Sequence, residues 1–67
     1  MHKYGLIKLM VDSNYSLGYR FDGANNYETE AEAREAFRER CWNCDRVDLI
    51  EYGKGLIETY CINKVLA

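Results

Sequence analysis

The sequence lacks proline, repeats and low-complexity segments, so nothing in it marks a linker or a domain boundary. Its 67 residues are therefore expected to form one small domain over residues 1–67. No apolar run approaches the roughly 20 residues that a membrane-spanning helix needs, and no membrane partner is expected. The first residues also lack the layout of a signal peptide, which predicts a cytoplasmic protein.

Histidine is scarce, and no motif of a known catalytic site occurs. The sequence contains no nucleophile elbow, P-loop, zinc-protease motif or dinucleotide fingerprint. The single histidine, His2, has no fixed spacing to any cysteine, so no Cys–His catalytic pair is indicated. A domain of this size, with a sheet and a helix as its two thin layers, also leaves little room for a ligand pocket of about 300 Å³. We expect a protein that is not an enzyme and needs no cofactor.

The sequence has no excess of positive charge, because nine basic residues stand against eleven acidic ones. Nucleic-acid binding depends on cations that contact phosphates, so a nucleic-acid partner is not expected. Negative charge is concentrated in residues 28–45, where six acids accompany three arginines. These acids form either a solvated helix surface or a surface that attracts a basic protein. The candidate acidic surface consists of Glu28, Glu32, Glu35 and Glu39.

Cysteine occurs three times, and an odd count argues against a framework of disulfides. Cys41 and Cys44 form a C-x-x-C motif, which is a spacing found in zinc sites. Cys61 and His2 would have to supply the other two ligands, because no second C-x-x-C exists. Cys41 and Cys61 are more simply explained as small buried apolar residues. We therefore expect no metal site, with zinc on these four residues as the lesser alternative.

Alternation of apolar and polar residues predicts strands over 4–11, 16–22, 46–52 and 56–62. The residues predicted to face the core from the first three strands are Ile7, Leu9, Val11, Leu17, Tyr19, Phe21, Val47 and Leu49. The last strand has two possible registers. One register turns Ile57, Thr59 and Cys61 inward, and the other turns Leu56, Tyr60 and Ile62 inward.

A helix is predicted over residues 29–42, since alanine, glutamate and arginine dominate there. Thr29 and Glu32 have the spacing of an N-terminal capping box, and Asn43 is a candidate C-terminal cap. The apolar face of this helix is predicted to contain Ala33, Ala36, Phe37 and Cys41. Gly53-Lys54-Gly55 is predicted to form a hairpin turn between the last two strands.

The expected fold is therefore α+β in the order β-β-α-β-β: a four-stranded antiparallel sheet with one helix packed on one face. A single helix covers only one face of such a sheet, so the other face should be uncovered. The residues predicted there as a partner-binding surface are Tyr4, Leu6, Met10, Arg20, Ile50, Tyr52 and Tyr60. Exposed apolar patches usually mark interaction sites, and tyrosine, methionine and arginine are enriched in interfaces. The predicted partner is another protein or a second copy of the chain.

In size, acidity and lack of catalytic motifs, the chain is similar to small binding proteins that viruses of bacteria make to block host enzymes or defence complexes. This likeness is one of type and involves no shared motif. It implies a small non-catalytic protein that inhibits another macromolecule by covering its surface, in the host cytoplasm if the protein is viral. The alternatives are a structural homodimer and an accessory module that binds nucleic acid or zinc.

Overall fold

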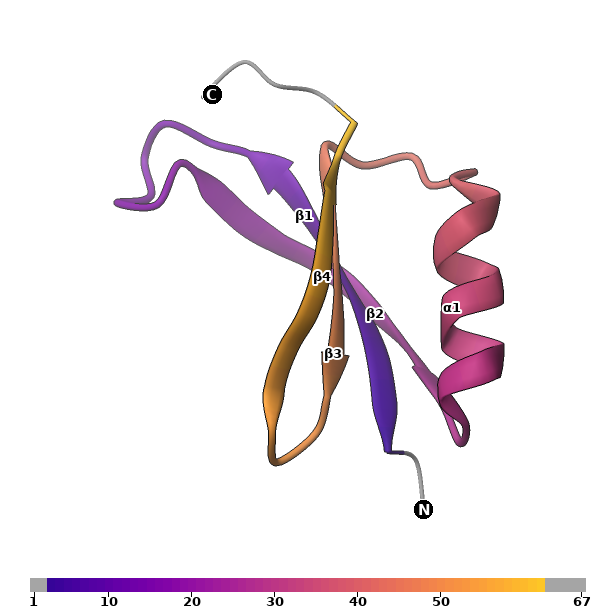
Figure 1. Ribbon diagram of the computed structural model, residues 1–67. Coiled ribbons are helices and arrows are strands. Elements are labelled where there is room, and N and C mark those ends of the chain that lie inside the picture. The colour runs from indigo at the N-terminus through magenta and orange to yellow at the C-terminus, as the bar shows by residue number, and fades with distance from the viewer. Residues whose placement is uncertain (1–2, 63–67) are drawn as a thin grey trace.

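The computed structural model describes residues 3–62, which form four strands and one helix (Figure 1). The elements in chain order are β1 (Tyr4–Val11), β2 (Tyr19–Tyr27), α1 (Glu30–Glu39), β3 (Arg46–Glu51) and β4 (Gly55–Cys61). All neighbouring strands are antiparallel, in the order β2-β1-β3-β4. The predicted α+β fold, with a four-stranded antiparallel sheet and one helix, is confirmed. No helix within residues 3–62 is long and apolar enough to span a membrane.

The first hairpin differs from its prediction because β2 starts later and runs further than expected. Residues 12–18 form the connecting loop, and β2 continues through residues 23–26, beyond the end of the predicted strand 16–22. Lys8 lies opposite Gly23 and Leu9 lies opposite Phe21, so Asp22 is an extra residue in a bulge. Pairing with the long strand β1 therefore overrides the weak strand propensity of glycine and asparagine.

The start of α1 is as predicted, and its end is not. The Glu32 amide donates to Thr29 Oγ1 at 3.2 Å, and the Thr29 hydroxyl donates to Glu32 Oε1 at 3.1 Å. The helix ends at Glu39, because Arg40 takes a left-handed conformation with φ of 53°. Arg40 rather than Asn43 is thus the C-cap, and Cys41 lies beyond the helix and is exposed.

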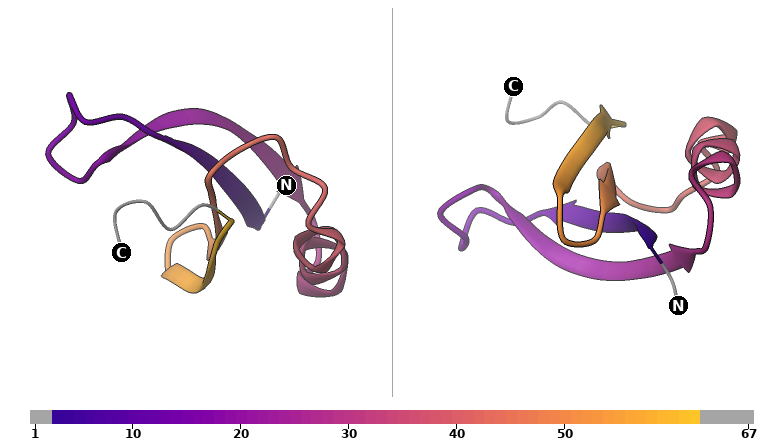
Figure 2. Two further views of the ribbon diagram at one scale, coloured as in Figure 1. Left: turned by 90° about the horizontal axis from the view of Figure 1, so that it is seen from above. Right: turned by 60° about the horizontal axis from the view of Figure 1, so that its bottom comes forward.

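The core lies between α1 and one side of the sheet. Leu6, Val47 and Leu49 are fully buried there, together with Ala33 and Phe37 from the helix. Leu6 pairs with Leu49 across the sheet, and residues directly opposite one another share a side. We call this side, which α1 covers, the helix side (Figure 2).

The prediction that Ile7, Leu9 and Val11 face the helix is wrong, since the even positions of β1 do so. Tyr4, Leu6 and Met10 pack in or against the core instead. Lys8 shares this side, and its Cε lies 3.6 Å from where a Cβ of Gly23 would be. The lysine stem therefore lies beside Gly23, and its length allows the charged end to reach solvent from the covered side. Lys8, whose charge favoured an outward direction for the even positions of β1, thus lies on the helix side.

The last strand follows neither predicted register as a whole. Leu49 pairs with Glu58 and Ile50 pairs with Leu56, so Ile57 is an extra residue in a bulge. The bulge changes which side chains point inward on either side of it, and both Ile57 and Tyr60 pack against the core. The turn itself is as predicted, with positive φ at Gly53 and Gly55.

Replacing Thr29 by alanine removes the oxygen that accepts from the Glu32 amide. We expect Thr29→Ala to lower the free energy of unfolding by about 1 kcal/mol, measured by urea denaturation. Thr29→Ser keeps the hydroxyl and should retain most of that stability. Equal losses in the two variants would show that the cap does not hold this helix end.

Candidate protein-binding surfaces

The side of the sheet opposite α1 carries an apolar surface that we call the open face. Its members are Ile7, Leu9, Phe21, Ile50 and Leu56, which come from all four strands, and Tyr52, which directly follows β3. Leu9 lies opposite Phe21 on β2, and Ile50 lies opposite Leu56 on β4, so the apolar side chains are neighbours across the strands. Phe21 is 63% exposed and Leu56 is 59% exposed. The open face is therefore apolar, with exposed residues on its edge strands and half-buried residues on β1 and β3.

Tyr52 lies across the open face above a glycine. A Cβ on Gly5 would fall 2.5 Å from the Tyr52 hydroxyl oxygen and 2.9 Å from its ring carbon Cζ. The Tyr52 hydroxyl donates to Asn26 Oδ1 on the edge strand β2. The tyrosine thus crosses β1 from the end of β3 to β2, and it fills the space that Gly5 leaves in the sheet surface.

Arg46 and Asp48 form an ion pair on β3, directly opposite Leu9 and Ile7 on β1. Arg46 Nε donates to Asp48 Oδ1 at 2.8 Å, and Thr59 Oγ1 donates to the same oxygen at 2.9 Å. The bond to Asp48 raises the pKa of Arg46. The two opposite charges neutralise one another, so this ion pair adds no net charge to the surface.

At the end of the sheet that carries Tyr19 and Cys61, the edge strands β2 and β4 approach one another on this side. The Arg46 guanidinium lies 5.3 Å from the centre of the Tyr19 ring, which belongs to β2. Partial burial raises the pKa of Tyr19, and its interaction with the Cys61 side chain on β4 raises it further. Tyr19 and Cys61 therefore limit the open face at this end.

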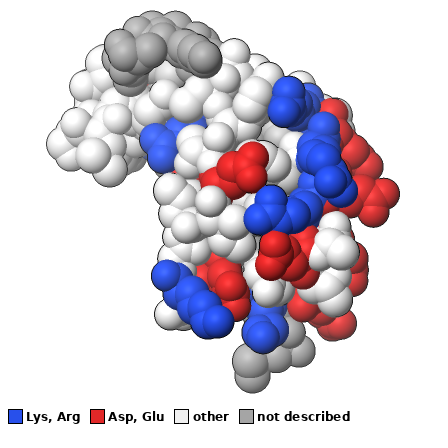
Figure 3. Space-filling view, in the orientation of Figure 1, with Lys and Arg blue, Asp and Glu red and all other residues white. Residues whose placement is uncertain are grey.

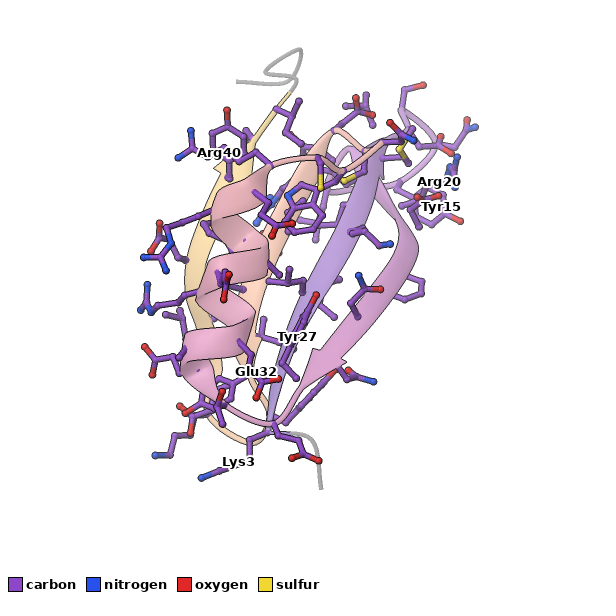
Figure 4. All side chains as sticks on the ribbon, turned by 90° about the vertical axis from the view of Figure 1, so that its right-hand side faces the viewer. Lys3, Tyr15, Arg20, Tyr27, Glu32 and Arg40 are labelled. Atoms are coloured by element: carbon purple, nitrogen blue, oxygen red, sulfur yellow. The ribbon has the colours of Figure 1, made fainter. Side chains whose placement is uncertain are left out.

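A second apolar surface is the loop between β1 and β2, which we call the hairpin tip (Asp12–Gly18). Its backbone is held by four hydrogen bonds. The Asp12 amide donates to the Gly18 carbonyl, the Gly18 amide donates to the Tyr15 carbonyl, and the Tyr15 amide donates to the Asp12 carbonyl. The Asn14 amide donates to Asp12 Oδ1. This ordered loop holds Leu17 86% exposed and Tyr15 55% exposed. Figure 1 shows the loop projecting from the body of the protein, and Figure 4 shows Tyr15 near Arg20 at this end.

The acidic surface of α1 is divided by arginines (Figure 3). All four predicted residues, Glu28, Glu32, Glu35 and Glu39, are exposed. However, Arg34 binds Glu30 at 2.7 Å and Glu58 at 3.2 Å, which raises the pKa of Arg34. The Arg40 guanidinium also covers the Tyr60 ring at 4.2 Å. The negative charge of the helix is thus interrupted along its length.

The predicted partner-binding surface is divided between the two sides of the sheet. Ile50 and Tyr52 lie on the open face, as expected. Tyr4, Leu6, Met10 and Tyr60 lie on the helix side, so their predicted place on the uncovered face is wrong. Arg20 is exposed near the hairpin tip, between Asp12 and Asp22, each at 3.7 Å.

The most exposed apolar residues were not among the predicted binding residues. Leu17 and Phe21 were predicted to be core, because they alternate with polar residues. The turn-forming residues Asp12 to Asn14 predicted a turn between the strands 4–11 and 16–22, and Gly18 was the available sign that this loop continues further. Leu56 was predicted to be inward in only one of the two registers considered.

The three cysteines are free and lie in different environments. Cys41 is exposed, Cys44 is buried and Cys61 is half-buried. Within residues 3–62, no group of three metal-binding side chains comes together, and His2 lies outside the described residues. Burial raises the pKa of the Cys44 thiol, and Lys8 offsets only part of this rise.

The surface formed by residues 3–62 contains no pocket. No family model matches the chain, and no curated protein and no solved structure matches it either. Inference about function therefore depends on the open face, the hairpin tip and the helix surface themselves.

Alkylation rates should separate the cysteines. A raised pKa leaves less thiolate at a given pH, and burial limits access, so Cys44 should react at least about ten times more slowly than Cys41 with iodoacetamide at pH 8. Peptide mass spectrometry after timed quenching measures both rates. The difference should vanish in concentrated urea, and equal rates in the folded protein would contradict the burial of Cys44.

Replacing Gly5 by alanine should displace the Tyr52 ring and break its bond to Asn26. We expect Gly5→Ala to lower the free energy of unfolding by about 1 kcal/mol. In a Tyr52→Ala background the same substitution should cost little, because nothing then occupies the space. Equal costs in the two backgrounds, measured by urea denaturation, would show that the tyrosine does not depend on the glycine.

Proposed function

We propose that this protein is a small non-catalytic binding protein that covers part of the surface of another protein, with its hairpin tip at the centre of the contact. The observation that carries this proposal is the exposure of Leu17, at 86%, together with Tyr15 on the same ordered loop. Large apolar side chains held in water at a projecting loop favour association, since association removes them from water.

The order of the hairpin tip supports its use in binding. A flexible loop loses conformational entropy when a partner fixes it, and that loss weakens the complex. Here the bonds within Asp12–Gly18 hold the loop before any partner arrives. Tyrosine is also enriched among residues that dominate binding energy, which makes Tyr15 the expected anchor beside the apolar contact of Leu17.

The proposed mechanism is steric. A body about 34 Å long that is anchored by its tip would obstruct the surface around the contact without any chemical step. This suits an inhibitor of an enzyme or of a defence complex, including one made by a virus and acting in the host cytoplasm. The helix surface is the weaker candidate for the contact, because Arg34 binds Glu30 and Glu58 and interrupts its negative charge.

Site-specific photo-crosslinking tests this proposal. A photoreactive amino acid is placed at Leu17 in one variant and at Glu35, on the exposed surface of α1, in a control variant. In bacterial lysate the Leu17 variant should give a discrete adduct that excess wild-type protein suppresses. Excess protein carrying Tyr15→Ser and Leu17→Ser should suppress it at least about tenfold less well. A discrete adduct from the Glu35 variant alone would contradict the proposal, as would no adduct from either.

A further inference from the structure

The open face is separate from the hairpin tip, and the proposed function does not use it. We infer that a second copy of the chain packs on the open face, so that the protein is a twofold-symmetric dimer. Its centre would be Ile7 and Ile50, with Phe21 and Leu56 on the edge strands around them. This inference stands independently of what the tip binds.

Charge favours a second copy on this side. All members of the open face are uncharged, and the adjacent Arg46 and Asp48 already neutralise one another at 2.8 Å. Two identical copies that meet here therefore bring no like charges together. The helix side is different, because residues 28–45 carry six acids and three arginines, and two such surfaces would repel one another.

The symmetry of a twofold dimer also suits a single apolar patch. An ordinary protein interface takes about 800 Å² from each partner, which is roughly a sixth of the 4596 Å² surface of this chain. A twofold contact uses the same patch on both copies, so one apolar patch is enough. Leu9 and Phe21 are neighbours on β1 and β2, and Ile50 and Leu56 are neighbours on β3 and β4. The paired Arg46 and Asp48 lie between these two groups, opposite Leu9 and Ile7.

The small size of the core gives a further physical reason for dimerisation. Only six apolar side chains in the described part of the chain are buried, namely Leu6, Ala33, Phe37, Cys44, Val47 and Leu49. Small domains bury a smaller share of their surface than large ones and commonly gain stability by association. On the open face Ile7, Leu9 and Ile50 are already half-buried by their neighbours, and a second copy would complete their burial. The dimer would then expose two hairpin tips.

Sedimentation equilibrium over a range of micromolar concentrations measures the mass of the wild-type protein, whose single chain is 7.9 kDa. We expect a dimer of twice that mass. Leu56→Lys places a charge in the interface and should weaken dimerisation at least about tenfold. Leu56 is largely exposed, so this variant should fold, which circular dichroism verifies. The matched control is Leu17→Lys on the hairpin tip, which should leave the dimer unchanged.

Three results would overturn the inference. The first is a wild-type monomer throughout the concentration range. The second is a dimer that Leu56→Lys does not weaken, because the contact would then lie elsewhere. The third is a dimer that Leu17→Lys dissociates, which would assign self-association to the tip. A monomer that still crosslinks through position 17 would reject the dimer and leave the proposed function intact.

Discussion

One helix of ten residues faces a sheet of four strands, and the alternation of side chains along a strand sends half of them to each side. The helix can shield only one of these sides. The central strand β1 makes this constraint acute, because it has apolar residues at both its odd and its even positions. Whichever set packs under α1, the other set remains on the far side of the sheet. The open face follows from this geometry.

Local features determine which set of β1 residues packs under the helix. Leu6 aligns with Leu49 on the covered side, and the stem of Lys8 lies beside Gly23 there. On the far side, Tyr52 covers Gly5, and Arg46 lies over the ring of Tyr19. These contacts cover parts of the open face, while Phe21 and Leu56 stay exposed at its edges. The remaining apolar surface is what a second copy would bury.

The sequence predicted those features that depend on a few adjacent residues. The Thr29 cap and the glycine turn at residues 53–55 are examples, because each is specified within one turn of chain. The facing of β1 was not predictable in this way, since both sets of its residues are apolar and a single lysine favoured the wrong one. The bulges at Asp22 and Ile57 also reverse the alternation on which such predictions depend. The exposure of Leu17 was missed for a related reason. Apolar and other residues alternate from Leu17 onwards, as they do in a strand, although Leu17 belongs to the loop.

The central claim is that the even residues of β1 lie under α1 and the odd residues form the open face. Nuclear Overhauser spectroscopy on the methyl-labelled protein tests it most directly. The account predicts contacts from the Leu6 methyl groups to Ala33 or Phe37, and none from Ile7 to the helix within one chain. Strong contacts between Ile7 or Leu9 and Phe37 of the same chain, with Leu6 accessible to a soluble paramagnetic probe, would contradict it.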